Sequence, residues 1–437
     1  MVSERFLFMT HTSEVKTEID LDGPVAWRRL VASLVIGSVG GVGMWSSVIL
    51  LPEIQNYFSL DRSEASLSYT VTMLGIVFGN VFMGRMVDKF GVVTPTLISA
   101  LCLGIGYFGI AFVESFWLFL VYQGILIGIF GASGTFGPMI SSVSLWFLRH
   151  RGIAVSLVAT GSYIAGTVWP PIVRELIDSL GWQMTHGIIG LVCVVIMVPL
   201  ALYLRGNHPA EPKEPLEEEM KSEMRAPFSL RTLQILLILA GIACCVAMSM
   251  PQVHIVAYCV DLEVGAQRGA EMLSLMFGLG VISRIAFGFI TDWIGPAWAL
   301  FIGSLLQAVS LLLYLPADDI LSLYLVSALF GLFQGGIVPA YAVIIRQYYP
   351  ASQAGVRVGL VLSATIGGMA FGGWFSGEIF DLTLSYEAAF LNGFIWNVFN
   401  LLIVALILWR SKKLIQPVIK RMTISIPAVG RWPGPLN

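Results

Sequence analysis

One arginine, Arg284, stands within residues 278–295, a stretch that otherwise has the composition of a membrane-spanning helix. Asp292, near the end of that stretch, lies eight residues further on, which corresponds to about 12 Å of helix at about 1.5 Å per residue. Arg284 is therefore predicted to lie close to the middle of a hydrocarbon layer about 30 Å thick. A charge at that depth costs about 2.5–3.5 kcal/mol even on insertion scales. We expect Arg284 to face a water-filled cavity and to meet an anion there.

The anion is expected to be the substrate, because the sequence offers no carboxylate deep inside a predicted span. Asp88 and Asp292 fall at the cytoplasmic edge of the spans. The guanidinium group of an arginine presents two parallel donors that match a carboxylate. The alternative is that Arg284 is structural and bonds to helix carbonyls and polar side chains. The other acidic residues near the spans lie at or beyond their outer ends: Glu53, Glu114, Glu175, Glu271 and Glu378.

Three more polar residues within the apolar runs are candidates for substrate binding. His254 is placed in the outer third of the seventh span, where it could carry a proton, because its unperturbed pKa is about 6.5. The alternative is a neutral histidine that is hydrogen-bonded between helices. Gln123 and Gln334 occupy near-symmetric positions in the fourth and tenth spans and are candidates for lining the cavity.

The composition is that of a membrane protein with many spans. Of the 437 residues, 57% are hydrophobic and 12% are charged, whereas a soluble domain carries about 25% charged residues. The five cysteines show no CxxC or Cys/His ligand spacing, and no nucleophile triad or phosphate-binding loop occurs in the loops. The sequence therefore predicts no enzyme activity, no catalytic residue, no metal site, no cofactor and no nucleic-acid partner.

Twelve apolar runs are each long enough to cross a membrane as a helix, which takes about 20 residues. Residues 206–231 are rich in Glu, Lys and Pro and are predicted to be a soluble linker between the first six and the last six runs. The predicted order is a cytoplasmic tail (1–28), a six-helix bundle (29–205), the linker (206–231), a second six-helix bundle (232–410) and a cytoplasmic tail (411–437). The predicted spans are 29–51, 66–84, 92–113, 116–140, 152–173, 186–205, 232–258, 271–291, 297–315, 321–345, 356–377 and 387–409.

The basic residues orient the chain, because the cytoplasmic loops of membrane proteins are enriched in Lys and Arg. With both termini in the cytoplasm, only Arg62, Arg174 and Arg268 of the 25 Lys and Arg residues fall outside the cell, and only Arg284 falls in a span away from its ends. The sequence thus predicts a multi-pass protein of the cell membrane with both termini in the cytoplasm.

The two halves repeat one motif. Residues 84–91 and 288–295 both have the pattern Gly-x-x-x-Asp-x-x-Gly, 204 residues apart, and they follow the second and the eighth span. Pro138 and Pro339 lie in the fourth and tenth spans at nearly the same offset. A repeated offset indicates duplication, so the bundles should be pseudo-symmetric, with the substrate between them at the midplane. The candidate gating residues in these motifs are Gly84, Asp88, Lys89, Gly91, Gly288 and Asp292.

The segment GRMVDKFG (84–91) resembles the signature between spans 2 and 3 of the major facilitator superfamily, although Val92 and Val93 replace its trailing basic pair. The resemblance implies the all-α major facilitator fold of twelve transmembrane helices. It also implies that Asp88 caps a helix N-terminus and locks the outward-facing state, which suits the preference of a helix dipole for an anion. The alternative for Asp88 is a solvated loop turn.

Other segments resemble the monocarboxylate transporter family and its bacterial members. They are DGPVAW (22–27), WFLRHRGIAVSLVATGSYIAGTVWPP (146–171), HIVAYCVDL (254–262) and ISRIAFGFITDWIG (282–295). The resemblance implies that Arg284 binds the substrate carboxylate, that His254 lies near the substrate path and that the membrane is a bacterial inner membrane. Two departures from the family's sequence pattern mean that the family's proton path is not implied for this chain. Gly280 stands where many members have an acidic residue, and Trp45, Ser46 and Ser47 stand where animal members have a lysine.

The predicted function is secondary active transport of small organic monoanions, as in monocarboxylate transporters. We expect it to be coupled to protons and to proceed by alternating access, with the protein working as a monomer in the lipid bilayer. The alternative is an organic-anion exchanger or an efflux transporter of amphipathic compounds. A non-transporting membrane receptor is disfavoured, because it would need a signalling domain.

Overall fold

Helices are the only regular secondary structure in the part of the chain that the structure describes. It is a computed structural model that describes residues 21–147, 149–206, 227–349 and 351–424. Within these residues, twelve helical stretches are long and apolar enough to cross a membrane. The all-α fold and the twelve spans expected from the sequence are thereby confirmed. Most of the predicted N-terminal tail and linker, and the last part of the C-terminal tail, lie outside the described residues.

The spans are longer than their apolar runs, because the helices continue into polar residues at both ends. The second span covers Arg62–Phe90, and the last helix continues beyond residue 411, where the sequence predicted a tail. The helices are α1 (Pro24–Gly40), α2 (Val42–Ile49), α3 (Leu51–Phe58), α4 (Arg62–Phe90), α5 (Val93–Ile110), α6 (Phe116–Val121), the π-helix η1 (Tyr122–Ala132), α7 (Ser133–Ser144), α8 (Arg151–Ala159), α9 (Gly161–Leu180), α10 (Trp182–Tyr203), α12 (Leu230–Asp261), α13 (Ala266–Ile294), α14 (Pro296–Leu313), α15 (Ile320–Gln334), α16 (Ile337–Tyr348), α17 (Ala351–Thr383) and α18 (Tyr386–Ile424).

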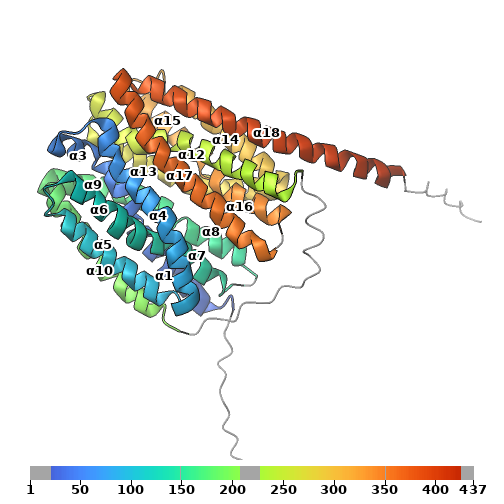
Figure 1. The fold of residues 1–437 in the computed structure, drawn as a ribbon, viewed down its shortest axis with the longest axis horizontal. Coiled ribbons are helices and arrows are strands. Elements are labelled where there is room, and N and C mark those ends of the chain that lie inside the picture. The colour runs from blue at the N-terminus through green and yellow to red at the C-terminus, as the bar shows by residue number, and fades with distance from the viewer. Residues whose placement is uncertain (1–20, 148, 207–226, 350, 425–437) are drawn as a thin grey trace, which may run out of the picture.

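The helices form two bundles of six spans each, α1 to α10 and α12 to α18. Figure 1 shows the blue-to-green half beside the yellow-to-red half, with α4 and α17 side by side between them. The main contacts between the halves join α4 to α17, α9 to α13, and both α2 and α3 to α12. These helix pairs form the surface along which one half can move against the other.

The duplication is visible in the backbone at the end of each repeated motif. Gly91 ends α4 and Gly295 ends α13, with φ angles of 71° and 88°, a conformation that glycine adopts without a steric penalty. Their N–H groups donate to the carbonyls of Val87 and Thr291 over 2.8 and 2.9 Å. The last glycine of each motif therefore terminates one span and turns the chain into the next.

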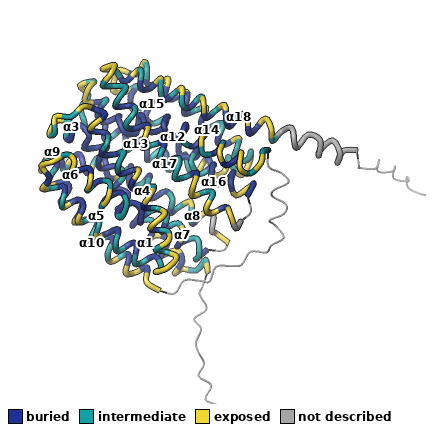
Figure 2. Tube along the Cα trace, viewed as in Figure 1, coloured by how far each residue is buried: buried dark blue, intermediate teal, exposed yellow. Residues whose placement is uncertain are grey.

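The outward faces of the bundles are apolar. In Figure 2, buried residues follow the faces where helices meet, and exposed residues follow the outward faces and the helix ends. Trp117 and Phe112 are 74% and 73% exposed. Extensive exposed apolar surface marks an interaction with another molecule or a membrane, and lipid tails would cover this one. The most enclosed span is α12, with 72% of its apolar window buried, as suits a helix at the centre of the fold.

The two ends of the molecule differ. We call the end at which α1 begins the terminal end, and the other the opposite end. At the opposite end the halves touch, since a Cβ on Gly377 of α17 would lie 2.9 Å from Cα of Ser63 in α4. Towards the terminal end of the same two helices, a Cβ on Gly355 of α17 or on Gly84 of α4 would have no neighbouring heavy atom within 4 Å. The main contacts of α7, α8 and α16, near the terminal end, are all within their own half. The halves are therefore closed together at the opposite end and apart at the terminal end.

Candidate substrate site

Arg284 lies on α13 at the place where this helix parts from α9 of the other half. A Cβ on Gly288, one turn further towards the terminal end, would meet open space. Four residues of α13 contact the other half in order from the opposite end towards the terminal end. They are Ser274, which bonds to the Thr167 carbonyl, Phe277 against Gly166, Gly280 against Tyr163, and Arg284, which bonds to the Ala159 carbonyl. Arg284 therefore stands at the vertex of the opening between the halves.

Two helix breaks supply the carbonyls that hold Arg284. The break between α8 and α9 leaves the Ala159 carbonyl free, because the N–H of Tyr163 donates to Thr160 instead, over 3.0 Å. The break between α15 and α16 frees the Gly335 carbonyl, because its helical donor would be the N–H that Pro339 lacks. Arg284 donates from Nη1 to Ala159 over 2.7 Å and from Nε to Gly335 over 3.2 Å.

An aromatic cluster, which we define as Trp45, Tyr163 and Phe277, adjoins the guanidinium group. The guanidinium carbon of Arg284 lies 4.1 Å from the centre of the Tyr163 ring, which is a favourable place for a cation. Phe277 packs edge-on against Tyr163 at 5.4 Å and lies 4.2 Å from Trp45. The cluster joins α2 and α9 of one half to α13 of the other.

Tyr163 takes the space in which an acidic side chain would stand in the resembled family. A Cβ on Gly280 would lie 2.5 Å from the Tyr163 ring, so this ring packs over the bare backbone of α13. Among the described residues, Arg284 has no carboxylate within ion-pair distance. The helix carbonyls named in the structural alternative are present, and they leave the positive charge of Arg284 uncancelled. That an anion binds there remains a prediction.

His254 lies away from Arg284, in a group of polar residues at the opposite end. It is completely buried. Its Nε2 is 2.7 Å from the carbonyl of Gly373, and its Nδ1 is 3.1 Å from the hydroxyl of Tyr386. The structure thus does not bring the two most polar candidates of the sequence together.

Gln123 and Gln334 are both fully buried, each within its own half. Gln123 accepts a hydrogen bond from Thr72 over 3.2 Å, and Gln334 accepts one from Gln252 over 2.6 Å. The Nε2 groups of Gln123 and Gln334 have no partner among the described residues. Sequence reasoning missed Gln252, although it stands only two residues before His254. Gln334 directly precedes Gly335, whose carbonyl accepts from Arg284, so this one buried amide lies at the same helix break as the partner of the arginine.

The candidate gating residues lie at the terminal end. Asp88, Lys89 and Asp292 are exposed, as is expected where the halves are apart. Gly84 and Gly288 have open space at their Cβ positions. Gly91 has the turn described above. A lock made by Asp88 would require the terminal end to close, so the gating role stays a prediction.

Two of the segments that resemble monocarboxylate transporters contact each other. The Asp22 carboxylate accepts hydrogen bonds from the backbone N–H groups of Arg149 and His150, each over 3.0 Å. The Trp27 ring lies edge-on to Phe147 at 5.1 Å. Asp22 therefore fixes the start of α8, the helix that ends at the Ala159 carbonyl. Nothing in the sequence pattern alone showed this contact.

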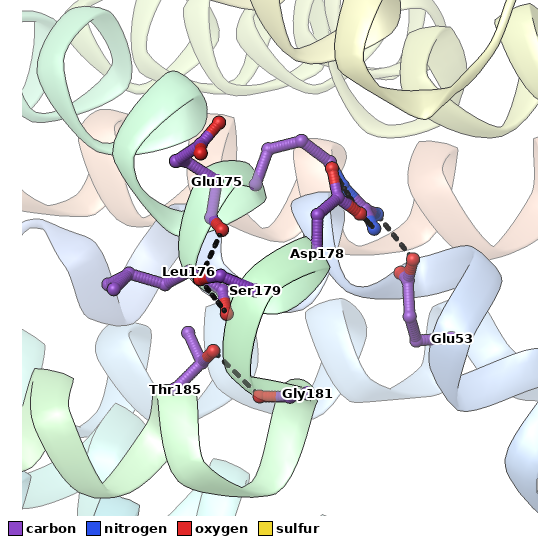
Figure 3. A network of polar contacts seen from close by, with 8 residues as sticks. Glu53, Glu175, Leu176, Asp178, Ser179, Gly181 and Thr185 are labelled. Carbon is purple, nitrogen blue, oxygen red and sulfur yellow. Dashed lines mark hydrogen bonds and ion pairs between the residues drawn. The ribbon is translucent and has the colours of Figure 1, made fainter.

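The arginines predicted to lie outside the cell are all in ion pairs at the opposite end. Arg62 pairs with Asp261, and Arg268 with Glu271, each over 2.9 Å. Arg174 of α9 bonds to Glu53 of α3 and to Asp178 one turn further along (Figure 3). The pair of Arg174 and Glu53 ties α3, the short helix after the first span, to the fifth span within one half.

Known proteins resemble the chain over most of its length. Residues 33–322 and 270–432 match the family model of the Major Facilitator Superfamily. The MFS transporter asaE of Aspergillus flavus is 25% identical over 363 residues, which cover 79% of this chain and 78% of that protein. The Agnestins efflux protein AgnL12 of Paecilomyces divaricatus is 23% identical over 315 residues, covering 71% of this chain and 70% of that protein.

A solved structure supports the fold. The crystal structure of a bacterial homologue of the human lysosomal transporter Spinster, in an inward-facing and unoccupied conformation, matches with a TM-score of 0.68 and 14% sequence identity. The match covers 90% of this chain and 98% of that one. These relatives are superfamily transporters and are not specifically monocarboxylate transporters, so the narrower resemblance remains a prediction. Twelve spans in two pseudo-symmetric bundles, together with the family match, describe a multi-pass membrane transporter and not an enzyme. The chain belongs to the major facilitator superfamily of secondary transporters.

Proposed function

We propose that this transporter exports amphipathic organic compounds that carry one negatively charged group. The observation that carries the proposal is the position of Arg284, an uncancelled cation held between the halves and stacked against the aromatic cluster. The guanidinium would bind the anionic group of the compound, since hydrogen bonds between charged partners are about twice as strong as neutral ones. The rings of Tyr163, Phe277 and Trp45 would receive its apolar part.

The charge count at the site favours one anionic group. Arg284 is the only Lys or Arg that lies in an apolar run of the sequence away from its ends, and it is held by neutral carbonyls. A second carboxylate on the compound would have to be buried without a cation, and burying an unpaired charge is costly. Compounds with one anionic group should therefore be preferred over dicarboxylates.

Two arguments support export. The distribution of basic residues predicts that the terminal end faces the cytoplasm, so in this state the opening between the halves would admit compounds from that side, as the first step of export requires. Among the relatives is a protein named for efflux, AgnL12. Efflux of amphipathic compounds fits this relative and the aromatic cluster better than uptake of a small monocarboxylate does.

Transport by purified protein in liposomes tests the proposal. Labelled probes would be an aromatic monocarboxylate, acetate, a dicarboxylate and a neutral amphipathic compound, each with and without a proton gradient. We expect the aromatic monocarboxylate to be carried fastest. Arg284→Gln should reduce its transport about 30-fold or more, because removing one member of a buried charged pair costs about 2–5 kcal/mol. Arg284→Lys should be intermediate, since it keeps the charge but loses the planar fork.

Arg268→Gln is the matched control. It removes an arginine from the same helix, but at an exposed ion pair with Glu271 near the opposite end. Such pairs contribute about 0–1 kcal/mol, so this variant should transport normally. If Arg284→Gln carried the anionic probe as well as the control does, the binding role of Arg284 would be lost.

The second candidate function is proton-linked transport of small monocarboxylates. The contact of Asp22 with the backbone of Arg149 and His150 favours it, since it joins two segments that resemble that family. In the same liposomes, accumulation of acetate driven by a proton gradient would support this function, and it would displace the export proposal if the larger anion were not carried.

A further inference from the structure

A carboxylate from one half caps a helix of the other at the opposite end. The backbone N–H groups of Arg62 and Ser63, the first two residues of α4, donate to the two carboxylate oxygens of Asp381 over 2.9 and 2.7 Å. The first N–H groups of a helix have no partner within the helix, and a negative charge there is favoured by the helix dipole. Asp381 belongs to α17, so these bonds form only while the two halves are together.

The side chain of Arg62 makes a second connection between the halves. Its Nη2 pairs with Asp261 of α12 over 2.9 Å, and its Nη1 donates to the hydroxyl of Tyr386 in α18 over 3.0 Å. The guanidinium carbon also lies 4.6 Å from the ring of Phe380. Arg62 is only 6% exposed, so the C-terminal half encloses a cation of the N-terminal half.

His254 completes this network, and the geometry assigns its hydrogen atoms. Its Nε2 must donate to the Gly373 carbonyl, because a carbonyl can only accept. The Tyr386 oxygen accepts from Arg62, which leaves the hydroxyl hydrogen free to be donated to Nδ1 of His254. His254 is therefore neutral and protonated on Nε2 when the opposite end is closed.

A second proton on His254 would conflict with this arrangement. Its Nδ1 would become a donor directed at the Tyr386 oxygen that already accepts from Arg62, and two cations would face one oxygen in a fully buried place. The carboxylates nearby are engaged, Asp261 by Arg62 and Asp381 by the start of α4. The charged and titratable groups of the network around His254 are thus Arg62 from α4, Asp381 from α17, Tyr386 from α18, and Asp261 on α12 itself, which joins it through Arg62. None of these groups is free to form an ion pair with a protonated His254.

We propose that His254 is a proton-binding site, and that a proton bound there opens the end of the transporter that Arg62 and Asp381 hold closed. Opening would withdraw Arg62 from Tyr386 and admit water to the imidazolium. Since the open state then binds the proton more tightly, acid must shift the population towards it. A tenfold difference in the proton affinity of His254 between the two states shifts the ratio of their populations by up to about tenfold. The proposal does not depend on which compound is carried.

Distances between spin labels across each end test this directly, in the full-length protein with its natural cysteines replaced. Labels on Asn56 and Leu382 report on the opposite end, and labels on Phe90 and Val356 report on the terminal end; all four residues are exposed. On acidification from about pH 8 to about pH 5, the range in which histidines titrate, the first distance should lengthen and the second should shorten. His254→Gln can keep a donor to Gly373 and an acceptor for Tyr386, and it should abolish the response.

Two variants keep the test decisive. His186→Gln changes another fully buried histidine, which bonds to the Trp182 carbonyl within the N-terminal half, and it should keep the response. Tyr386→Phe removes the hydroxyl that links His254 to Arg62, and it should open the opposite end further and at higher pH, whether or not His254→Gln folds. The proposal is overturned if wild-type distances do not depend on pH, or if folded His254→Gln or Tyr386→Phe responds like the wild type.

Discussion

At the scale of the residue, the partners of Arg284 determine what it can do. A carboxylate partner within the protein would cancel the charge and leave little attraction for an anionic compound. Backbone carbonyls supply hydrogen bonds that lower the cost of burying the guanidinium group, yet they carry no net charge. With Ala159 and Gly335 as acceptors and Tyr163 as a stacking partner, Arg284 is held in place and its charge remains available.

Gly280→Asp tests this argument. The new carboxylate would stand one helical turn before Arg284 and would compete with Tyr163 for the guanidinium. We expect transport of the anionic aromatic probe in liposomes to fall about tenfold or more, which corresponds to about 1.4 kcal/mol. Gly280→Asn introduces a side chain of equal size without the charge. It crowds the Tyr163 ring equally but should retain more transport than Gly280→Asp. Equal losses in the two variants would show that crowding, and not charge, is responsible.

At the scale of the element, the site depends on two interrupted helices, one in each half. The apolar runs predict the spans and the depth of Arg284, because both follow from local composition. The partners of Arg284 do not follow from local composition, since Ala159 lies 125 residues away and reaches it only when the halves pack. Pro339 was visible in the sequence as part of the repeat. That the Gly335 carbonyl, which it leaves free, accepts from Arg284 becomes known only from the packed structure.

The ends of the helices were also predicted too short, because polar caps such as Asp61 with Glu64 extend a helix beyond its apolar run.

Pro339→Ala tests the role of the helix break. The alanine N–H could donate to the Gly335 carbonyl and so compete with Nε of Arg284. One hydrogen bond contributes about 0.5–1.5 kcal/mol, so the apparent affinity for the anionic probe should weaken about twofold to tenfold, as measured by the concentration dependence of transport. Pro138→Ala makes the same change at the related position of the other half. The residue 204 positions before Arg284 is the neutral Asn80, so this control should leave the affinity for the anion unchanged. Equal effects of both variants would mean that the prolines matter only for helix packing.

At the scale of the whole molecule, α4 and α17 run antiparallel between the halves and each ends in an aspartate-bearing segment. At the opposite end, Asp381 near the end of α17 caps the start of α4. At the terminal end, Asp88 near the end of α4 is exposed, and α17 begins at that same end. If Asp88 capped the start of α17 when the terminal end closes, one helix pair would carry two locks that cannot be made together. Alternating access would then follow from an exchange of one cap for the other.

Asn substitutions at the two aspartates should shift the conformational balance in opposite directions. Each removes a negative charge from a helix N-terminus, and hydrogen bonds to charged groups contribute about 1.5–3 kcal/mol, so a change of about tenfold or more in the ratio of the two states is expected. Asp381→Asn should lengthen the Asn56–Leu382 label distance and shorten the Phe90–Val356 distance, whereas Asp88→Asn should do the reverse or leave an already open terminal end unchanged. Asp319→Asn is the control, because Asp319 caps the start of α15 through the N–H of Ser322 and the main contacts of α15 are within its own half. A shift in the same direction for Asp88→Asn and Asp381→Asn would show that the two aspartates do not act as alternating locks.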